Sequence, residues 1–261
     1  MNSSEASKNR IITLITDFGY RDPFVGQMKG VILKINPYVK IIDITHDITS
    51  HDIEEASFIL WESFKYFPEE TIHLIVVDPQ VGSKRKALIV KSQNHYFVAP
   101  DNGVLSHVIK EQSFTAFSIE EKKYILKKHS PTFQGRDIFA PVSAWLSKGI
   151  PIEKFGKPFY EPFMIDIPLP EKTKNKIVGK IIYIDKFGNA ITNIKASKKQ
   201  IKHIKIAGLK LPIVNYYAES PQNPAALINS NGFVEIFIYK GNAAGFLNLK
   251  KGMNVEAIIY G

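Results

Sequence analysis

Four apolar runs in the first part of the chain each end in an aspartate. The runs and their aspartates are 11–16 with Asp17, 40–42 with Asp43, 74–77 with Asp78, and 96–100 with Asp101. Ligands of open α/β sheets bind outside the carboxyl ends of the strands, where carboxylates can hold sugar hydroxyls or face a cation. One such aspartate is usually a loop or cap residue. With four in one domain, we expect one or two to contact a ligand.

The most specific of these segments joins Asp78 to Arg85. A turn separates the two residues, and it can fold the arginine back towards the strand end. A guanidinium paired with the carboxylate would fix it and keep it ionised. A purely structural salt bridge remains the alternative for this segment taken alone.

Three further polar segments are candidates for a site. Residues 131–137 precede a predicted helix whose first N–H groups suit a carboxylate or an oriented water, with Asp137 read as its N-cap and Gly135 as a point of close backbone approach. Residues 185–189 and 229–232 read as turns in the second half of the chain. Each of these turns alone is an ordinary β-turn.

The composition and the motifs exclude several classes of protein. Cysteine is absent, so disulfides, thiolate metal sites and a catalytic thiol are excluded. The sequence has no P-loop, no G-x-G-x-x-G after its first strand and no H-E-x-x-H. We therefore expect no metal and no cofactor. No apolar stretch has the length of a signal or membrane segment, so we expect a cytoplasmic protein without membrane contact.

The net charge of +9 comes from one region of the chain. Residues 171–210 hold eleven lysines and two acids. A lysine-rich face can bind nucleic acid. The segment lacks arginine and has little aromatic interleaving, so a solvated surface is the favoured interpretation and nucleic acid is not expected as a partner.

The spacing of apolar residues predicts the elements that must position these groups. Continuous apolar strands alternate with helices, which indicates a mostly parallel sheet with helices on both faces. We expect strands over 11–16, 40–44, 72–77, 87–91 and 95–99, and helices over 22–35, 52–66, 104–110 and 137–147, the first with Asp22 as N-cap. Five prolines in 151–171 indicate a linker. Short strands over 177–184, 204–206, 211–214, 233–238 and 255–260 predict a small all-β barrel or sandwich.

These predictions give a domain organisation of three parts. They are a flexible tail over 1–10, an N-terminal α/β domain over 11–165 and a C-terminal β-barrel domain over 172–261.

Six segments, in order, resemble the S-adenosylmethionine (SAM) hydroxide adenosyltransferase family. Members are also called SAM hydrolases, and they are the sister group of the SAM-dependent fluorinase and chlorinase. The segments are Thr16-Asp17-Phe18-Gly19 with Lys29-Gly30, Asp43-Ile44-Thr45-His46, residues 78–85, 132–141, 185–193 and 229–235. They extend over nearly the whole chain, and their order makes the resemblance specific.

The resemblance implies a fold, an assembly and a reaction. The family has an N-terminal α/β domain and a C-terminal β-barrel, assembled as a homotrimer that binds its ligand between subunits. Its reaction is attack by water or hydroxide at C5′ of SAM, which gives adenosine and L-methionine without a metal. Orientation and exclusion of bulk water are then the main tasks of the protein.

The resemblance also implies roles for individual residues. Asp78 and Arg85 match two of the three residues that orient the water, and Asp17 matches the residue that holds the ribose hydroxyls. Phe133 would pack near C5′, and Asp22 would contact the methionine ammonium group unless it caps a helix. The C-terminal domain would contribute Asp185, Phe187, Asn189, Tyr216, Ser230, Glu235 and Ala243.

The chain departs from the family at two positions, with Gln80 in place of glycine and Gln134 in place of histidine. The third water-orienting residue is histidine in the family and Gln134 here, and a glutamine amide cannot take a proton near neutral pH. His129 could substitute only if the fold brings it to the site. By the same resemblance, the halogenases have a tyrosine at the position that matches Asp78. An anionic side chain at this position repels a halide, which favours water as the nucleophile.

Three hypotheses follow. The first is a SAM hydrolase, and the second is a trimer that binds SAM or adenosine with little or no turnover because of Gln134. The third is a nucleic-acid-associated protein that uses the lysines of 171–210.

Overall fold

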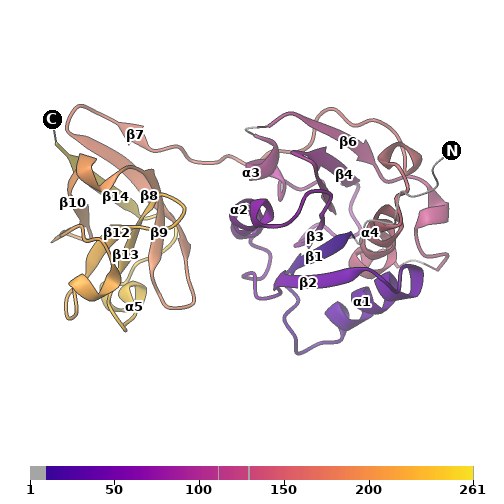
Figure 1. Cartoon of the computed structure of the whole chain (residues 1–261), viewed down its shortest axis with the longest axis horizontal. Coiled ribbons are helices and arrows are strands. Elements are labelled where there is room, and N and C mark those ends of the chain that lie inside the picture. Colours follow the sequence, from indigo (N-terminus) through magenta and orange to yellow (C-terminus); the bar gives the residue numbers. More distant parts are fainter. Residues whose placement is uncertain (1–9, 111, 129, 261) are drawn as a thin grey trace. The chain divides into compact units, whose positions relative to one another are not determined.

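A computed structural model describes residues 10–110, 112–128 and 130–260 (Figure 1). Residues 1–9 of the expected tail and His129 lie outside the described residues. The chain divides into two compact units, residues 1–166 and 167–261. No helix within the described ranges is long and apolar enough to cross a membrane.

The N-terminal unit is built on a mixed six-stranded sheet in the order β2-β1-β3-β5-β4-β6. The first four strands in this order are parallel, while β4 pairs antiparallel with both β5 and β6. The strands are β1 (Ile11–Thr16), β2 (Lys40–Thr45), β3 (Ile72–Val76), β4 (Ala87–Ser92), β5 (His95–Pro100) and β6 (Phe114–Ser118). The prediction of parallel pairing therefore holds for part of the sheet, and β6 is an edge strand that the sequence did not suggest.

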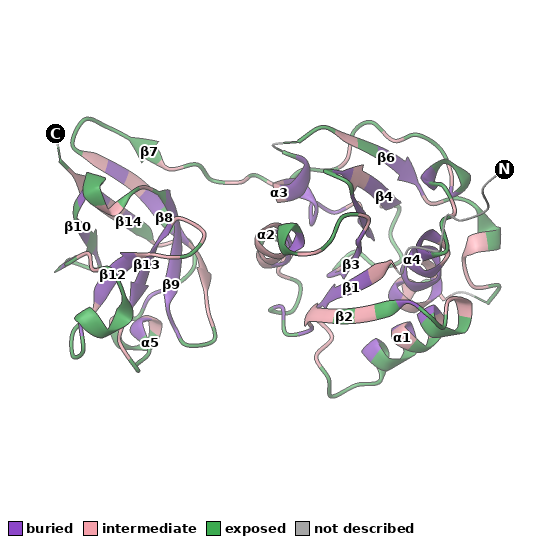
Figure 2. Ribbon diagram, in the orientation of Figure 1, coloured by how far each residue is buried: buried purple, intermediate pink, exposed green. Residues whose placement is uncertain are grey.

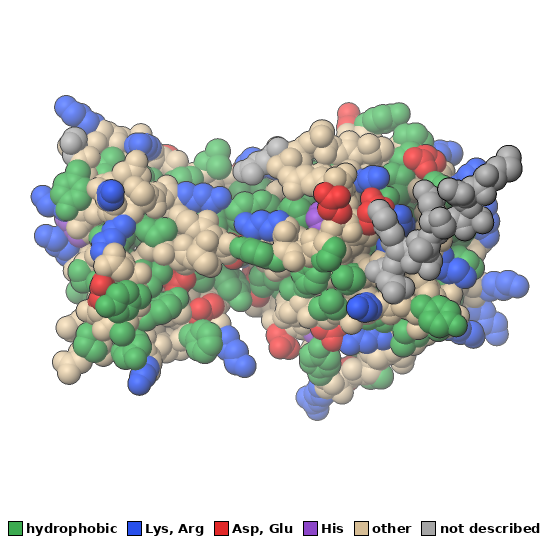
Figure 3. All heavy atoms as spheres, viewed as in Figure 1, with side chains coloured by type: hydrophobic (Ala, Val, Ile, Leu, Met, Phe, Trp, Pro, Cys, Tyr) green, Lys and Arg blue, Asp and Glu red, His purple; other side chains and the backbone are tan. Residues whose placement is uncertain are grey.

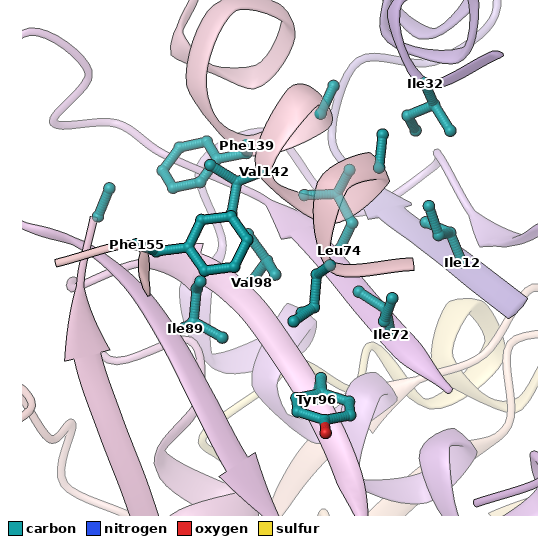
Figure 4. Close-up of a cluster of buried hydrophobic side chains, with 14 of the residues drawn as sticks. Ile12, Ile32, Ile72, Leu74, Ile89, Tyr96, Val98, Phe139, Val142 and Phe155 are labelled. Carbon is teal, nitrogen blue, oxygen red and sulfur yellow. The ribbon is translucent and has the colours of Figure 1, made fainter. Parts of the chain in front are cut away.

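Helices cover both faces of this sheet, as expected from strands that are apolar on both sides. Helices α1 (Phe24–Ile35) and α4 (Ala140–Ser147) pack on one face, and α2 (Ile53–Ser63) and α3 (Ser106–Ile109) pack on the other. Figure 4 shows the first core, where Ile72 and Leu74 of β3 lie among side chains from the neighbouring strands and helices. All five residues of β3 are buried, so this strand forms the centre of the unit.

Two predicted caps are wrong. Helix α1 has Pro23 at its N-cap, without a side-chain hydrogen bond, so Asp22 lies one residue too early to cap it. Asp137 lies within a π-turn, Gly135–Phe139, that precedes α4. Its side chain is fully buried and accepts from Arg136 and from the Ser130 N–H, so tertiary contacts override the local preference for a cap.

The C-terminal unit is a curled antiparallel sheet with strand order β11-β10-β14-β8-β9-β13-β12, and β7 pairs with β8. The strands are β7 (Glu171–Lys172), β8 (Lys176–Ile184), β9 (Ala190–Lys195), β10 (Ile201–Ile206), β11 (Leu209–Leu211), β12 (Ala225–Ile228), β13 (Phe233–Phe237) and β14 (Asn254–Ile259). One core lies inside it, and Figure 2 shows the buried strands that enclose this core. One short helix, α5 (Ala243–Leu247), interrupts the β structure.

Short 3-10 helices connect several of these elements. They are Phe64–Tyr66, Lys122–Tyr124, Ile152–Lys154, Lys198–Gln200 and Tyr217–Glu219.

Candidate functional site

Asp78, Arg85 and Gln134 form one hydrogen-bonded cluster at the carboxyl end of β3. Arg85 Nε lies 3.0 Å from each carboxylate oxygen of Asp78, and a terminal guanidinium nitrogen donates to Asp78 Oδ2. The same nitrogen donates to Gln134 Oε1. The side chains of Asp78 and Arg85 are 4% and 5% exposed, so this pair is shielded from bulk solvent.

The hydrogen-bonding capacity of the three side chains fixes what the cluster can offer a ligand. A guanidinium has only donors, so the oxygen of Gln134 must face Arg85 and its NH₂ group is left to donate elsewhere. The carboxylate of Asp78 has about four lone-pair sites. It accepts from two guanidinium nitrogens and from the Gln80 N–H, which lies 3.3 Å from Oδ1. Because the Nε–H is shared between the two oxygens and the Gln80 N–H lies 3.3 Å away, Oδ1 is the less strongly engaged oxygen and can still accept from a proton donor such as water.

Close packing brings the two loops of this cluster together. Gly82 has φ +82°, and a Cβ there would lie 3.1 Å from the carbonyl oxygen of Pro131. Gly135, directly after Gln134, lies against Met28, Phe133 and Val76. Helix interruptions of the π type occur often at functional sites, and this one starts at the residue after Gln134.

Phe133 belongs to an aromatic cluster on the same side of the unit. Its ring packs edge-on against Phe18 at 6.0 Å and against Phe24 at 5.2 Å, between ring centroids. The Arg136 guanidinium lies 4.9 Å from the Phe133 ring centroid. Phe24 is 40% exposed, so the cluster reaches the surface. No pattern in the sequence predicted that Phe18 and Phe24 pack against Phe133.

The other three aspartates have different environments, and Asp43 lies within β2 rather than after it. Asp17 is 8% exposed at its side chain and accepts from the His51 N–H at 3.0 Å. Asp43 accepts from Lys29 Nζ and the Tyr20 hydroxyl at 2.6 and 2.8 Å.

Asp101 binds the backbone at Phe163, near the end of the N-terminal unit. Its Oδ1 accepts from the Phe163 N–H at 2.7 Å. Burial raises the pKa of Asp101, and this effect outweighs the Phe163 hydrogen bond and the Arg85 charge. Asp22 is exposed.

In the part of the chain that the structure describes, no three His, Cys, Asp or Glu side chains gather as metal ligands. Each of the four aspartates accepts from N–H or O–H donors of the protein. A site of this kind suits hydroxyl groups and water as ligands.

The turn 185–189 organises the candidate residues of the C-terminal unit. Asp185 accepts from the backbone N–H groups of Phe187 and Asn189 and from the Asn189 side chain, at 2.8 to 3.0 Å. These bonds leave the Phe187 ring 72% exposed. The Gly188 carbonyl accepts from Ala244, which docks the turn on α5 beside the fully buried Ala243.

Glu235 is buried and supports another side chain. Its Oε1 accepts from the Tyr217 hydroxyl at 2.7 Å. Burial raises the pKa of Glu235 despite its hydrogen bonds from Tyr217 and Asn229. Ser230 lies exposed in the adjoining turn. Tyr216 is 59% exposed. The neighbouring Tyr217, which the sequence analysis did not single out, is the tyrosine that donates to Glu235.

On the face visible in Figure 3, the described Lys and Arg side chains form no single basic surface. Lys and Arg side chains there are scattered among apolar and uncharged polar groups over both units. This distribution is typical of a solvated surface.

Comparison with known proteins gives matches over most of the chain. The family model of the SAM hydroxide adenosyltransferase N-terminal domain matches residues 12–156, and that of the C-terminal domain matches residues 179–256. A protein of Methanocaldococcus jannaschii named (R)-S-adenosyl-L-methionine hydrolase is 37% identical over 95% of each chain. A fluorinase of an Actinoplanes species is 27% identical, over 96% of this chain and 98% of its own.

A solved structure shares the fold. It is that of an uncharacterized conserved protein from Thermotoga maritima, which is 34% identical and superposes with a TM-score of 0.89 over 95% of this chain and 99% of its own.

Proposed function

The chain belongs to the SAM hydroxide adenosyltransferase family, and from that membership we propose that it hydrolyses SAM to adenosine and L-methionine. Water or hydroxide forms a bond to C5′ while the bond from C5′ to sulfur breaks. The electron pair of that bond goes to the sulfonium, which leaves as the neutral thioether of methionine. The leaving group needs no proton, so the protein has to orient the nucleophile and accept its proton.

The observation that carries this proposal is the cluster of Asp78, Arg85 and Gln134. We assign Asp78 Oδ1, the less strongly engaged oxygen, to a proton of the attacking water, and the NH₂ group of Gln134 to a lone pair of its oxygen. Arg85 holds both partners in place. A negative carboxylate at this position disfavours a halide as the nucleophile, which distinguishes the proposed reaction from that of a fluorinase.

The proposal assigns the substrate contacts to both units. In the N-terminal unit, Asp17 binds the ribose hydroxyls, Phe133 packs near C5′ and Asp22 takes the methionine ammonium group. In the C-terminal unit the contacts are Asp185, Phe187, Asn189, Tyr216, Ser230, Glu235 and Ala243. No cofactor is required, because SAM itself is the activated substrate.

We also propose a homotrimer with the ligand at the subunit interface. Exposed aromatic rings support this assembly, since the candidate residue Phe187 is 72% exposed and Phe24, which packs on the candidate residue Phe133, is 40% exposed. Light scattering coupled to size-exclusion chromatography tests it, and a monomer at micromolar concentration contradicts it. Cytoplasmic placement stays a prediction from the sequence.

The reaction is tested by incubating the purified protein with SAM in water enriched in ¹⁸O and analysing the products by liquid chromatography and mass spectrometry. We expect equal amounts of adenosine and methionine, with one ¹⁸O atom in the 5′-hydroxyl group. Fluoride or chloride in the assay is expected to give no 5′-halogenated nucleoside.

Two outcomes contradict the proposal. A halogenated product identifies a halogenase, and tight binding of adenosine without turnover identifies a binding protein. In the latter case Gln134→His tests whether the missing imidazole is the cause.

A further inference from the structure

A chain of buried polar side chains joins the ends of β1 and β2 beneath Asp17. His46 Nδ1 lies 2.8 Å from Thr16 Oγ1, and His46 Nε2 lies 3.1 Å from Asp43 Oδ1. Thr16 is fully buried and His46 is 1% exposed. None of these three residues has a place in the proposed reaction.

The partners of each atom determine where the protons lie. A carboxylate can only accept, so the Nε2–H form of His46 is the one that suits Asp43, and Nδ1 then accepts from the Thr16 hydroxyl. Thr16 Oγ1 also accepts from the Phe18 N–H at 3.3 Å. Neither Nε2 nor Asp43 Oδ1 has an aligned hydrogen bond among the described residues, and the two buried atoms lie 3.1 Å apart.

Asp43 is held as an anion at the far end of this chain. Its second oxygen accepts from Lys29 and Tyr20. Burial alone would raise the pKa of Asp43, but the hydrogen bonds from Lys29 and Tyr20, together with the close approach of His46, outweigh burial and keep the pKa below its ordinary value. A fixed negative charge on Asp43 stabilises the Nε2–H form of His46.

The loop that carries Asp17 is hydrogen-bonded to the loop of His46. The Gly19 N–H donates to the His46 carbonyl at 2.8 Å, and the Ile48 N–H donates to the Thr16 carbonyl at 3.4 Å. Gly19 has φ +62°, a conformation that the loop needs in order to turn back onto His46. Both residues that flank the segment 17–18 are therefore bonded to the loop of His46.

We propose that Asp43, His46 and Thr16 form a positioning relay that sets the Asp17 carboxylate for the ribose hydroxyls. The inference rests on the proposed function, in which Asp17 binds ribose. His46 acts through Thr16 and the loop, so it is a positioning residue, and its loss weakens nucleoside binding more than it slows the chemistry at Asp78. Small displacements of a positioning group have large effects, so we expect adenosine affinity to fall about tenfold or more.

The test uses variants that preserve one link of the relay at a time. In His46→Asn the side-chain oxygen takes the place of Nδ1 and still accepts from Thr16. In His46→Gln the amide nitrogen takes the place of Nε2 and still reaches Asp43. His46→Ala loses both links. Tyr20→Phe is the matched control, since it removes a hydrogen bond from the other oxygen of Asp43.

Adenosine affinity is measured by calorimetry, KM and kcat are measured with SAM, and urea unfolding shows that each variant is folded. We expect His46→Ala to lose affinity and raise KM with kcat little changed, and His46→Asn to recover most of the affinity. We expect Tyr20→Phe to bind as the native protein does. If His46→Ala does not fold, Thr16→Val against Thr16→Ser compares loss and retention of the same hydroxyl.

Asp17→Ala separates failure of the relay from failure of the proposed function. Native affinity in folded His46→Ala, with lost affinity in Asp17→Ala, overturns the relay alone. Native affinity in both variants overturns the assignment of Asp17 to ribose as well. A loss of stability in the His46 variants with unchanged affinity identifies a purely structural role and also overturns the relay.

Discussion

Replacing Asp78 by asparagine removes one charge from the candidate site while keeping the shape of the side chain. In the native protein both carboxylate oxygens accept from Arg85. An asparagine has only one acceptor oxygen, so its NH₂ group would face a guanidinium donor. The variant therefore loses its anion, one contact to Arg85 and the acceptor for the proton of water.

The burial of the pair sets the size of the effect on stability. Asp78 and Arg85 are 4% and 5% exposed, so solvent does not compensate the lost charge. Removing one partner of a buried ion pair costs about 3–5 kcal/mol. Loss of a positioned general base lowers a rate by about 10²–10⁴-fold. At about 1.36 kcal/mol for each tenfold change, this is roughly 3–5 kcal/mol of transition-state stabilisation.

The assay measures kcat and KM for adenosine formation beside urea unfolding. We expect Asp78→Asn to remain folded, to bind adenosine within about threefold of the native protein, and to lose about 10²–10⁴-fold in kcat. Asp47→Asn is the matched control, because Asp47 is an exposed aspartate just beyond another strand end. It is expected to change neither rate nor stability.

One result would refute the reasoning. If folded Asp78→Asn forms adenosine at the native rate, the carboxylate neither accepts the proton nor orients the water. Adenosine binding by the variant shows that a loss of activity is not caused by unfolding.

Three further predictions concern the site and its supports. Gln134→His is expected to raise kcat at pH 8 by up to about 100-fold and to add an inflection near pH 6.5, because imidazole titrates there and an amide does not; identical pH profiles of the two proteins contradict the proposed role. Burial, aided by the neighbouring His95, lowers the pKa of His73 to about 3, so the folded protein keeps it neutral while the unfolded chain binds a proton below about pH 6.5. Stability is therefore lost as the pH falls, by about 2 kcal/mol at pH 5 for this residue, and urea unfolding of His73→Asn at pH 7 and pH 5 should show a smaller loss between the two pH values. Gly188→Ala is expected to destabilise the C-terminal unit by about 1–3 kcal/mol more than Gly232→Ala, since both glycines have positive φ but only at the first would a Cβ collide with the Asn242 side chain. Equal thermal shifts of the two variants would contradict this contact.

Local patterns in the sequence account for much of the fold. The run 72–76 is apolar except for His73, and it became the buried central strand β3, because a strand covered on both faces favours apolar residues at nearly every position. Asp17, Asp78 and Asp101 follow strands for the same reason, whereas Asp43 lies within β2. Two strands with weaker patterns were not predicted: β6 has mixed polarity, and β12, although apolar, has only four residues.

Local preferences were misleading where tertiary contacts are stronger. Asp137 has the residue type and position of a helix cap, but Arg136 and Ser130 hold it inside a π-turn. Tyr216 and Tyr217 are indistinguishable by type, and the 3-10 turn at Tyr217–Glu219 directs the second tyrosine to Glu235. Neither outcome depends on spacing along the chain.

Residue types and their order along the chain were enough to indicate the family, the composition of the candidate site and the pairing of Asp78 with Arg85, because a turn of six residues can close that pair. The folded structure was needed to show that Gln134 shares Arg85 with Asp78, although 49 positions separate Gln134 from Arg85, and that its amide oxygen is the atom turned inward. It also decided that His46 lies between Asp43 and Thr16. These contacts join residues from different strands and loops, and their geometry follows from how the sheet brings those segments together and which donors and acceptors remain to be satisfied.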